Sequence, residues 1–459
     1  MKKLIVLLAL PFFALAALGQ EPLKLSFDQA VEMAQKNSVK LKNSELDILL
    51  AKQKVREILS NGLPQVSATA QLTYFPEIPV QALPDFISPA VYGVLFKEGL
   101  LTPKQVGSND VFAARFGTTY NGQASATLSQ LIFDGTFFLG VQASKSYVQL
   151  SEMMLEKSKL DVDSGVTKAY MSVLITGKSL EVLKDGSKRL EKTYADTREL
   201  YKNGFVEKLD VDRLELATSN LKAQIDKVQG LYNLVMALFN FQIGAKLDEK
   251  VELTTTLEEL TSRFAPDDLA NSSLDLNNRI EYRILNKSLN LQAYDLKRWK
   301  VAYYPSVAAF GNIGYTNPSN TFNYFSGDAT WYRSSYLGAQ VRIPIFDGFY
   351  KDSKIKQAKY TLQQLENTKK NLEYGLGIDA INNKLKYINA QTQLKNQKTS
   401  LELAERIYNT SKLKYNEGVG NSFELISAEN DFKQAQLNYM NSLYELLNAG
   451  YDLKRALGK

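Results

Sequence analysis

The chain has 459 residues, with 55 Lys and Arg against 49 Asp and Glu, and it contains no cysteine and no histidine. These absences remove disulfides, thiol nucleophiles, the commonest general base and the best zinc ligands, so we expect no enzyme, no catalytic residues, no cofactor and no metal site. The formal charge of +6 comes from interleaved acids and bases, which indicates a solvated surface and no nucleic-acid partner.

The N-terminal segment has the features of a secretory leader. Lys2 and Lys3 precede an apolar run that is too short to span a membrane comfortably, and small residues follow it. A buried strand or a membrane anchor is the alternative, but Pro11 and the polar residues after the run fit a processed leader better. We predict a signal peptide over residues 1–19 and an exported mature chain.

Beyond the leader, the period of the apolar residues changes between helix and strand. Apolar residues at helical spacing predict one amphipathic helix from Ser26 to about Asn61, with Ser26 as its N-cap. From Val66 to Tyr74 every even position is apolar and every odd position is polar, as in a strand with one apolar and one polar face. Similar patterns predict four strands in all, at about 64–75, 119–133, 305–316 and 332–346.

A very long helix is predicted after the second strand of each pair. The segments at about 136–200 and 349–414 contain no proline and are rich in Lys, Glu, Leu and Ala. Each would be roughly 100 Å long at ~1.5 Å per residue, a length typical of coiled coils, although glycines such as Gly165 allow bends or breaks. Return helices are predicted at about 206–244 and 421–457, the first with a heptad stripe for packing on a partner helix.

Two short motifs occur twice and in the same order. Ile-Phe-Asp-Gly ends at Gly135 and Gly348, before each long helix, and Tyr-x-x-Gly begins at Tyr201 and Tyr415, at the end of each long helix. The spacing between the copies is almost the same for both motifs, so the chain is an internal duplication. The predicted parts are a first repeat at 20–246, an acidic linker with one short helix at 247–273, and a second repeat at 274–459.

Ile-Phe-Asp-Gly lies where a strand gives way to a helix. Asp134 and Asp347 can cap the first helical amides, and Gly135 and Gly348 permit a tight change of direction. We predict a structural role for these junctions.

A second feature, the proline-rich segment at 76–117, is predicted as a long loop between two strands, and loops of this length are usually functional or exposed.

Four amphipathic strands cannot close a membrane barrel alone. Membrane barrels need about eight strands or more, and an open sheet edge cannot lie in lipid, so several chains must pool their strands. A small soluble sandwich is the alternative, but it leaves the long helices without a role. Aromatic residues at the strand ends could mark the membrane interface: Tyr74, Tyr120, Tyr315, Trp331 and Tyr336.

The signal peptide, the duplicated helix-strand-strand-helix plan and the two paired motifs resemble the TolC family of outer-membrane channel proteins. The resemblance covers essentially the whole mature chain. It implies a mainly α fold with a membrane β-barrel contribution, in which long coiled-coil helices form a periplasmic α-barrel and four strands per chain form a shared, trimeric, twelve-stranded barrel. The implied partners are two further copies of the chain, a periplasmic adaptor (membrane fusion) protein, an inner-membrane transporter and outer-membrane lipid.

The resemblance also assigns roles to residues. The family's constriction falls on Glu424 and Ser427, and Asp210 is the duplicate of Glu424; the serine departs from the family's acidic pair and puts a double acidic ring in doubt. A carboxylate ring would favour cations in a narrow pore, whereas an acid near a helix N-terminus is the structural alternative. Adaptor docking is implied at the hairpin tips, where helix termination by glycine is the alternative role. The tip residues are Tyr201, Gly204, Phe205, Tyr415, Gly418 and Val419.

We therefore expect an exit duct of a tripartite efflux or type I secretion system. It would lie in the outer membrane of a Gram-negative-type envelope, with its helical part in the periplasm, and substrates delivered by an inner-membrane pump would pass through it passively. The alternative is a periplasmic coiled-coil scaffold or adaptor without a pore, which would have no use for the four amphipathic strands.

Overall fold

The computed structural model describes residues 23–84, 87–100, 111–266 and 268–459, so the predicted signal peptide lies outside the described residues. The chain divides into two compact units. Unit 1 comprises residues up to Ala51, Ser146–Leu291 and Thr361–Lys459, and unit 2 comprises Lys52–Lys145 and Gln292–Tyr360. Each unit takes residues from both predicted repeats, because the strand pairs of the two repeats join one sheet.

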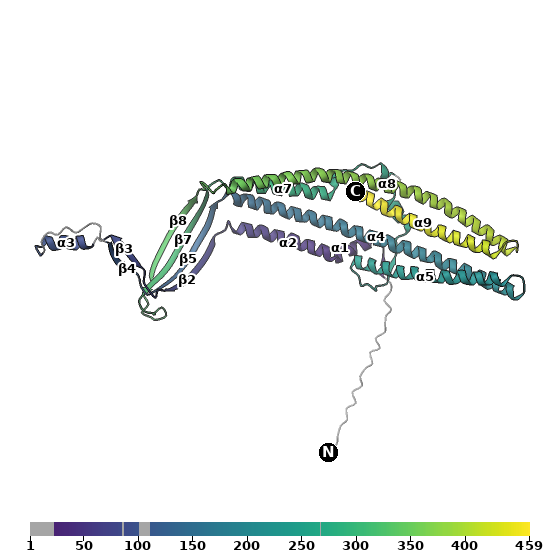
Figure 1. Cartoon of the computed structure of the whole chain (residues 1–459), viewed down its shortest axis with the longest axis horizontal. Helices are drawn as coiled ribbons and strands as arrows, with labels where there is room; N and C mark the ends of the chain where they lie inside the picture. Colours follow the sequence, from purple (N-terminus) through teal and green to yellow (C-terminus); the bar gives the residue numbers. More distant parts are fainter. Residues whose placement is uncertain (1–22, 85–86, 101–110, 267) are drawn as a thin grey trace, which may run out of the picture. The chain divides into compact units, whose positions relative to one another are not determined.

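That sheet is the main feature of unit 2. Its four antiparallel strands are β2 (Gln65–Tyr74), β5 (Tyr120–Phe133), β7 (Ser306–Ser319) and β8 (Tyr332–Arg342), in the order β2-β5-β7-β8 (Figure 1). β8 ends earlier than the predicted position near residue 346, because Pro344 has no amide to donate to the ladder. Among the described residues, the two outer strands, β2 and β8, each have one edge without a partner strand.

The proline-rich segment at 76–117 is more regular than the predicted loop. Its described part contains β3 (Val80–Pro84), α3 (Ile87–Lys97) and β4 (Val111–Arg115). β3 and β4 pair with each other as a separate antiparallel ladder. The sequence predicts a loop here because prolines are frequent in loops, although the apolar run of α3 is typical of a helix.

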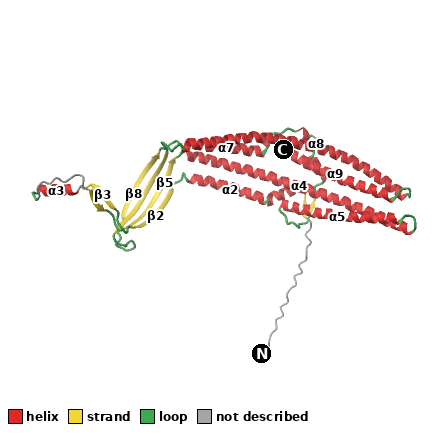
Figure 2. Ribbon diagram, viewed as in Figure 1, coloured by secondary structure: helices red, strands yellow, loops and turns green. Residues whose placement is uncertain are grey.

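Two helical hairpins make up most of the chain's helical structure. The first consists of α4 (Gly135–Lys202) and α5 (Lys208–Ile243), and the second of α8 (Tyr350–Asn416) and α9 (Ser422–Leu457), all red in Figure 2. α4 continues through its internal glycines without a break. A Cβ on Gly177 would lie 3.2 Å from the ring of Tyr232, so this glycine makes room for the close packing of α5.

The predicted N-terminal helix is two helices, α1 (Phe27–Asn37) and α2 (Val39–Ser60). Ser26 caps α1 in a capping box with Gln29, as the sequence predicts. The prediction of one continuous helix is wrong at Ser38, which leaves helical geometry with a ψ of 120°. The break lies where Asn37 meets the end of α5 and its amide group donates a hydrogen bond of 3.3 Å to the Ile243 carbonyl.

The predicted linker contributes to the core of unit 1. It contains β6 (Val251–Leu253), which pairs in parallel with β1 (Leu23–Leu25), and α6 (Leu257–Phe264). The fully buried Tyr170 hydroxyl joins both segments, since it donates to the Leu25 carbonyl at 3.2 Å and accepts from the Thr255 amide at 3.1 Å. Two short 3-10 turns (Leu269–Asn271 and Leu276–Asn278) lead into α7 (Ile280–Val301), which precedes β7.

Candidate functional site

The first Ile-Phe-Asp-Gly junction is built around Asp134. Its Oδ1 accepts hydrogen bonds from the Thr136 amide at 2.7 Å and the Phe137 amide at 3.2 Å, which satisfies the free donors at the start of α4. Gly135 is the first helical residue, and a Cβ there would lie 2.1 Å from Cγ1 of Val301. The glycine is therefore needed for the close approach of α7.

The second junction has the same residue types in a different backbone geometry. Asp347 Oδ2 accepts from the Lys351 amide at 3.2 Å and from the Lys351 ammonium at 2.9 Å, and this bond to Lys351 lowers the pKa of the Asp347 carboxyl. Gly348 and Phe349 both have a φ of 64°, so two left-handed residues turn the chain before α8 begins at Tyr350. Both aspartates cap a helix, but only Gly348 is needed for its backbone conformation.

Both Tyr-x-x-Gly motifs end their helices in the same way. At the first tip, the Gly204 amide donates to the Tyr201 carbonyl at 3.0 Å and the Phe205 amide donates to the Leu200 carbonyl at 2.9 Å. Gly418 and Val419 repeat the pattern at the second tip. This pair of bonds is a Schellman motif around a left-handed glycine. The glycines thus terminate the helices, the structural role that the sequence left open beside docking.

The side chains that follow the two tip glycines are exposed and can contact a partner protein. The side chains of Phe205 and Val419 are 76% and 79% exposed, although apolar residues at this position of a Schellman motif usually pack on the helix. Tyr201 is also exposed, whereas Tyr415 is half-buried and its hydroxyl lies 2.5 Å from Oγ1 of Thr197 on α4. The two tips are therefore alike in backbone and unlike in their tyrosines.

The predicted constriction residues do not form one cluster. Glu424 Oε1 lies 3.1 Å from Nζ of Lys414 and accepts a hydrogen bond from Ser411 at 3.4 Å. Asp210 accepts a hydrogen bond from Ser422 of α9. Ser427 is exposed. The structure thus brings Asp210 to the start of α9, and it places a lysine against Glu424 that weakens the negative field of that carboxylate.

Sequence reasoning missed a buried ion pair between the two hairpins. Glu429 of α9 is only 6% exposed, and its Oε1 accepts from Arg189 of α4 at 3.1 Å (Nε) and 2.9 Å (Nη2). The guanidinium lies 5.8 and 5.7 Å from the ring centroids of Tyr408 and Phe432, and these two rings are stacked. Burial, followed by the nearby Glu429, raises the pKa of Tyr408 to about 12.

The only sequence signal for this pair was an acid within an apolar stripe. Leu425, Ala428 and Phe432 are buried on α9, and Glu429 lies among them. A charge at such a position needs a buried partner. Its partner is 240 positions away in the chain, so no local pattern could identify Arg189.

The four-stranded sheet has two faces of opposite polarity. Cross-strand partners such as Val66 with Leu128, and Gly311 with Leu337, share one face because side chains alternate along each strand. We call this the apolar face, and it includes Val66, Ala68, Ala70, Leu72, Ala124, Ala126, Leu128, Ile313, Leu337, Ala339 and Val341. The opposite, polar face includes Gln65, Ser67, Thr69, Gln71, Gln123, Ser125, Thr127, Asn312, Ser334 and Gln340.

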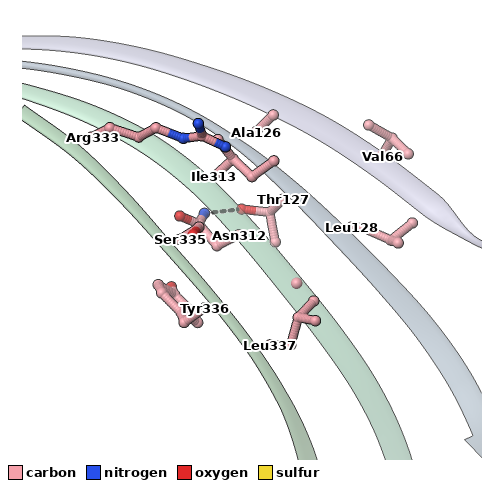
Figure 3. A pocket seen from close by; sticks show the side chains of 11 residues that line it. Val66, Ala126, Thr127, Leu128, Asn312, Ile313, Arg333, Ser335, Tyr336 and Leu337 are labelled. Carbon is pink, nitrogen blue, oxygen red and sulfur yellow. Dashed lines mark hydrogen bonds between the residues drawn. The ribbon is translucent and has the colours of Figure 1, made fainter.

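Hydroxyl and amide groups bond across the strands of the polar face. Asn312 donates to Oγ1 of Thr127 at 2.7 Å, as Figure 3 shows, and the hydroxyls of Thr69 and Ser125 lie 3.0 Å apart. Tyr336 lies opposite Asn312 and therefore on the polar face, so its predicted place among the interface aromatics of an apolar surface is wrong. The reason is that even-numbered residues of β8 alternate away from Leu337.

A shallow hollow of about 560 Å³ lies against the sheet. Most of its lining belongs to the apolar face, including Val66, Leu128 and Leu337 in Figure 3. Arg333 is the charged residue of the lining. The apolar lining suits hydrocarbon better than a polar ligand.

The described residues lack the features of two other kinds of site. No group of three or more acidic, histidine or cysteine side chains in the described ranges is arranged to hold a metal ion. In the same ranges, every helix is too short or too polar to cross a membrane.

Comparison with known proteins gives one family and several solved structures. Residues 285–459 match the family model "Outer membrane efflux protein". A search of curated proteins finds no match. The description of the matched family agrees with the predicted location in the outer membrane.

The similar structures are outer-membrane proteins that match nearly the full chain. The outer membrane protein VceC from Vibrio cholerae has 15% identity and a TM-score of 0.67, covering 94% of this chain and 96% of that one. The CmeC outer membrane channel of Campylobacter jejuni has 16% identity and a TM-score of 0.68, covering 94% and 85%. The MtrE outer membrane channel of Neisseria gonorrhoeae, solved in its open state, has 14% identity and a TM-score of 0.66, covering 94% and 88%.

The similarity to these structures concerns the fold, since the identities are low. The sequence predicted helical hairpins connected to a four-stranded sheet, and the structure has both. The resemblance to the TolC family is confirmed: residues 285–459 match the outer membrane efflux protein family, and the chain as a whole has the fold of the similar outer-membrane channels.

Proposed function

We propose that this protein is the outer-membrane exit duct of a tripartite efflux or type I secretion system. The observation that carries the proposal is the sheet of unit 2, which has one apolar face, one polar face and two edges that no described strand of the chain covers. Such a sheet cannot lie in lipid alone, but three copies joined edge to edge would make a closed barrel of twelve strands. The apolar face would then meet outer-membrane lipid and the polar face would line the pore.

Exposed apolar stripes on the helices support a homotrimer. On α8, Tyr374, Ile378, Ile381, Leu385 and Ile388 recur at alternating spacings of four and three, which is a coiled-coil seam, yet all five are exposed. α5 has a similar exposed seam, formed by Leu231, Leu234, Leu238 and Phe241.

The two seams lie at similar heights on their hairpins. Leu385 and Leu238 are each roughly 30 residues from their own hairpin tip, or about 45 Å at ~1.5 Å per residue. An exposed seam of this kind needs a partner helix, and a second copy of the chain can supply one at the matching height. We therefore propose that α8 of one subunit packs on α5 of the next.

The tips are proposed as the docking surface for a periplasmic adaptor, which would join the duct to an inner-membrane transporter. Phe205 and Val419 offer apolar contacts there. Opening of the periplasmic end would require the two hairpins of a subunit to separate, which breaks the Arg189–Glu429 pair and the Thr197–Tyr415 contact. Transport itself would be passive, with energy supplied by the transporter.

The proposal can be tested on the purified full-length protein. We expect it in the outer-membrane fraction, as trimers in detergent, and as pores in planar lipid bilayers. Because the chain contains no cysteine, Ser67→Cys in β2 together with Ser334→Cys in β8 permits a clean crosslink between subunits. We expect a ladder up to covalent trimers with a short bifunctional thiol reagent. Recovery in the soluble periplasm without pores would favour the scaffold or adaptor alternative and refute the duct.

A further inference from the structure

A groove of about 350 Å³ lies between α5 and α9, near the tips of the two hairpins. Its walls combine apolar and basic side chains. Leu216 and Phe423 line it and are 63% and 64% exposed, and Arg213 and Lys433 are its charged residues. None of the described residues that line it is acidic.

Among the described residues, neither cation of the groove lies within salt-bridge distance of a carboxylate, although Glu429 acts on Lys433 from farther away. The guanidinium of Arg213 lies 5.7 Å from the ring centroid of Phe423. Lys433 donates a hydrogen bond of 3.0 Å to the amide oxygen of Asn430. Burial lowers the pKa of Lys433, and the nearby Glu429 carboxylate offsets part of this effect, so the ammonium is partly desolvated.

Three carboxylates near the start of α5 or α9 have partners outside the groove lining. Glu424 pairs with Lys414 and the buried Glu429 pairs with Arg189, while Asp210 accepts from Ser422. Both helices also begin within about two turns of the groove, so the positive ends of their dipoles add to its potential. The lining of the groove thus offers two cations and no acidic side chain to a ligand.

We propose that this groove binds small organic anions with an apolar, preferably aromatic, body. Phe423 and Leu216 would contact the body, and Arg213 and Lys433 would hold the anionic group. The volume matches a small molecule, since such sites measure about 300–1,000 Å³. The walls extend over only about three helical turns, too little to enclose a partner helix along its length. The proposal rests on the proposed function only in that bound anions would be cargo entering the duct.

The test compares two probes that share one aromatic body. Binding of 8-anilinonaphthalene-1-sulfonate, an anion, and of uncharged N-phenyl-1-naphthylamine is followed by fluorescence on the full-length protein in nanodiscs. The variant Arg213→Gln/Lys433→Gln should weaken sulfonate binding at least ~tenfold and leave binding of the neutral probe unchanged, because a loss of ~1.4 kcal/mol corresponds to a factor of ten. Phe423→Ala/Leu216→Ala should weaken both probes.

A matched control removes two lysines from α5 outside the groove. Lys208→Gln/Lys227→Gln should leave the binding of both probes unchanged. Equal loss in this control, or no loss in the groove variant, overturns the proposal. If the groove variant does not assemble, Arg213→Gln alone, at an exposed residue, must weaken sulfonate binding at least ~threefold, or the proposal fails.

Two further outcomes separate this inference from its rivals. If sulfonate binding is unaffected by the groove variant but capture of the adaptor is lost, the groove docks an acidic helix and the small-anion proposal is wrong. Failure of the wild-type protein to form pores in bilayers would refute the duct but would leave the probe-binding result standing.

Discussion

Arg189 and Glu429 form a buried salt bridge between the two hairpins, and the loss of one partner should strongly destabilise the protein. Two charges lose water when they are buried, and their mutual attraction offsets that loss only while both are present. The carboxylate side chain is 8% exposed and the guanidinium 30%. Removal of the cation therefore leaves the better-buried carboxylate without its salt bridge, with the Tyr408 hydroxyl and the Lys433 charge near it.

We predict that Arg189→Met destabilises the protein by about 3 kcal/mol, because Glu429 stays buried and loses its salt bridge. The double variant Arg189→Met/Glu429→Met should recover most of that loss. Thermal unfolding of the solubilised protein measures both. Lys178→Met, which breaks the exposed pair with Glu181, serves as the control and should change stability by less than about 1 kcal/mol. A double variant as unstable as the single one would contradict the prediction.

Because of Tyr408, which belongs to the same cluster, the stability of the protein should depend on pH in the alkaline range. Its pKa is raised to about 12 in the folded chain, mainly by burial and then by Glu429, against about 10 when unfolded. A raised pKa stabilises the fold fully below the unfolded value, and this contribution is lost as pH rises from about 10 to 12. Stability should therefore fall more over this range in the wild type than in Tyr408→Phe. Parallel curves for the two proteins in denaturant titrations would exclude the effect.

At the scale of elements, local patterns predicted most of the secondary structure and failed where tertiary packing decides. The period of two marked all four strands of the sheet, and the glycine motifs marked the ends of both long helices. The break at Ser38 was missed because it depends on Asn37 meeting the end of α5, more than 200 positions away in the chain. The paired motifs predicted the tips and junctions of the site, but not Arg189 or the groove between α5 and α9, which only the folded chain assembles.

Gly375, inside α8, and Gly418, in the turn just after α8, have opposite effects on stability. Gly418 has a φ of 73°, which a Cβ strains, whereas Gly375 lies within the helix; no atom is within 4 Å of a Cβ at either position. Gly418→Ala should therefore destabilise the hairpin by about 1 kcal/mol, and Gly375→Ala should stabilise it by about the same amount. Circular dichroism melting curves compare the two variants. A loss of stability in both would mean that subunit packing, and not backbone conformation, governs Gly375.

At the scale of the whole molecule, the proposed pore combines a mainly uncharged polar lining in the membrane with charged groups at the tips. On the polar face of the sheet, the cross-strand partners named above are uncharged, and the charged residue of that face is Arg342, which pairs with Ser306 at the end of β8. Discrimination between cations and anions would then arise at the tips, where Glu424 is the proposed constriction residue. The negative charge of Glu424 is partly offset by Lys414, whose Nζ lies 3.1 Å from the Oε1 of Glu424.

Lys414→Gln should increase the preference of the pore for cations, because it removes the positive charge that offsets Glu424 in each subunit. The measurement is the reversal potential in planar bilayers under a potassium chloride gradient. Lys412→Gln is the matched control: Lys412 is an exposed neighbour on α8, its recorded contact is with the Tyr408 ring, and its loss should shift the potential less. The variant Lys414→Gln/Glu424→Gln should return the potential toward that of the wild type. Equal shifts for the two lysines would show that Glu424 acts as one surface charge among many, and the constriction would then have to lie elsewhere in the duct.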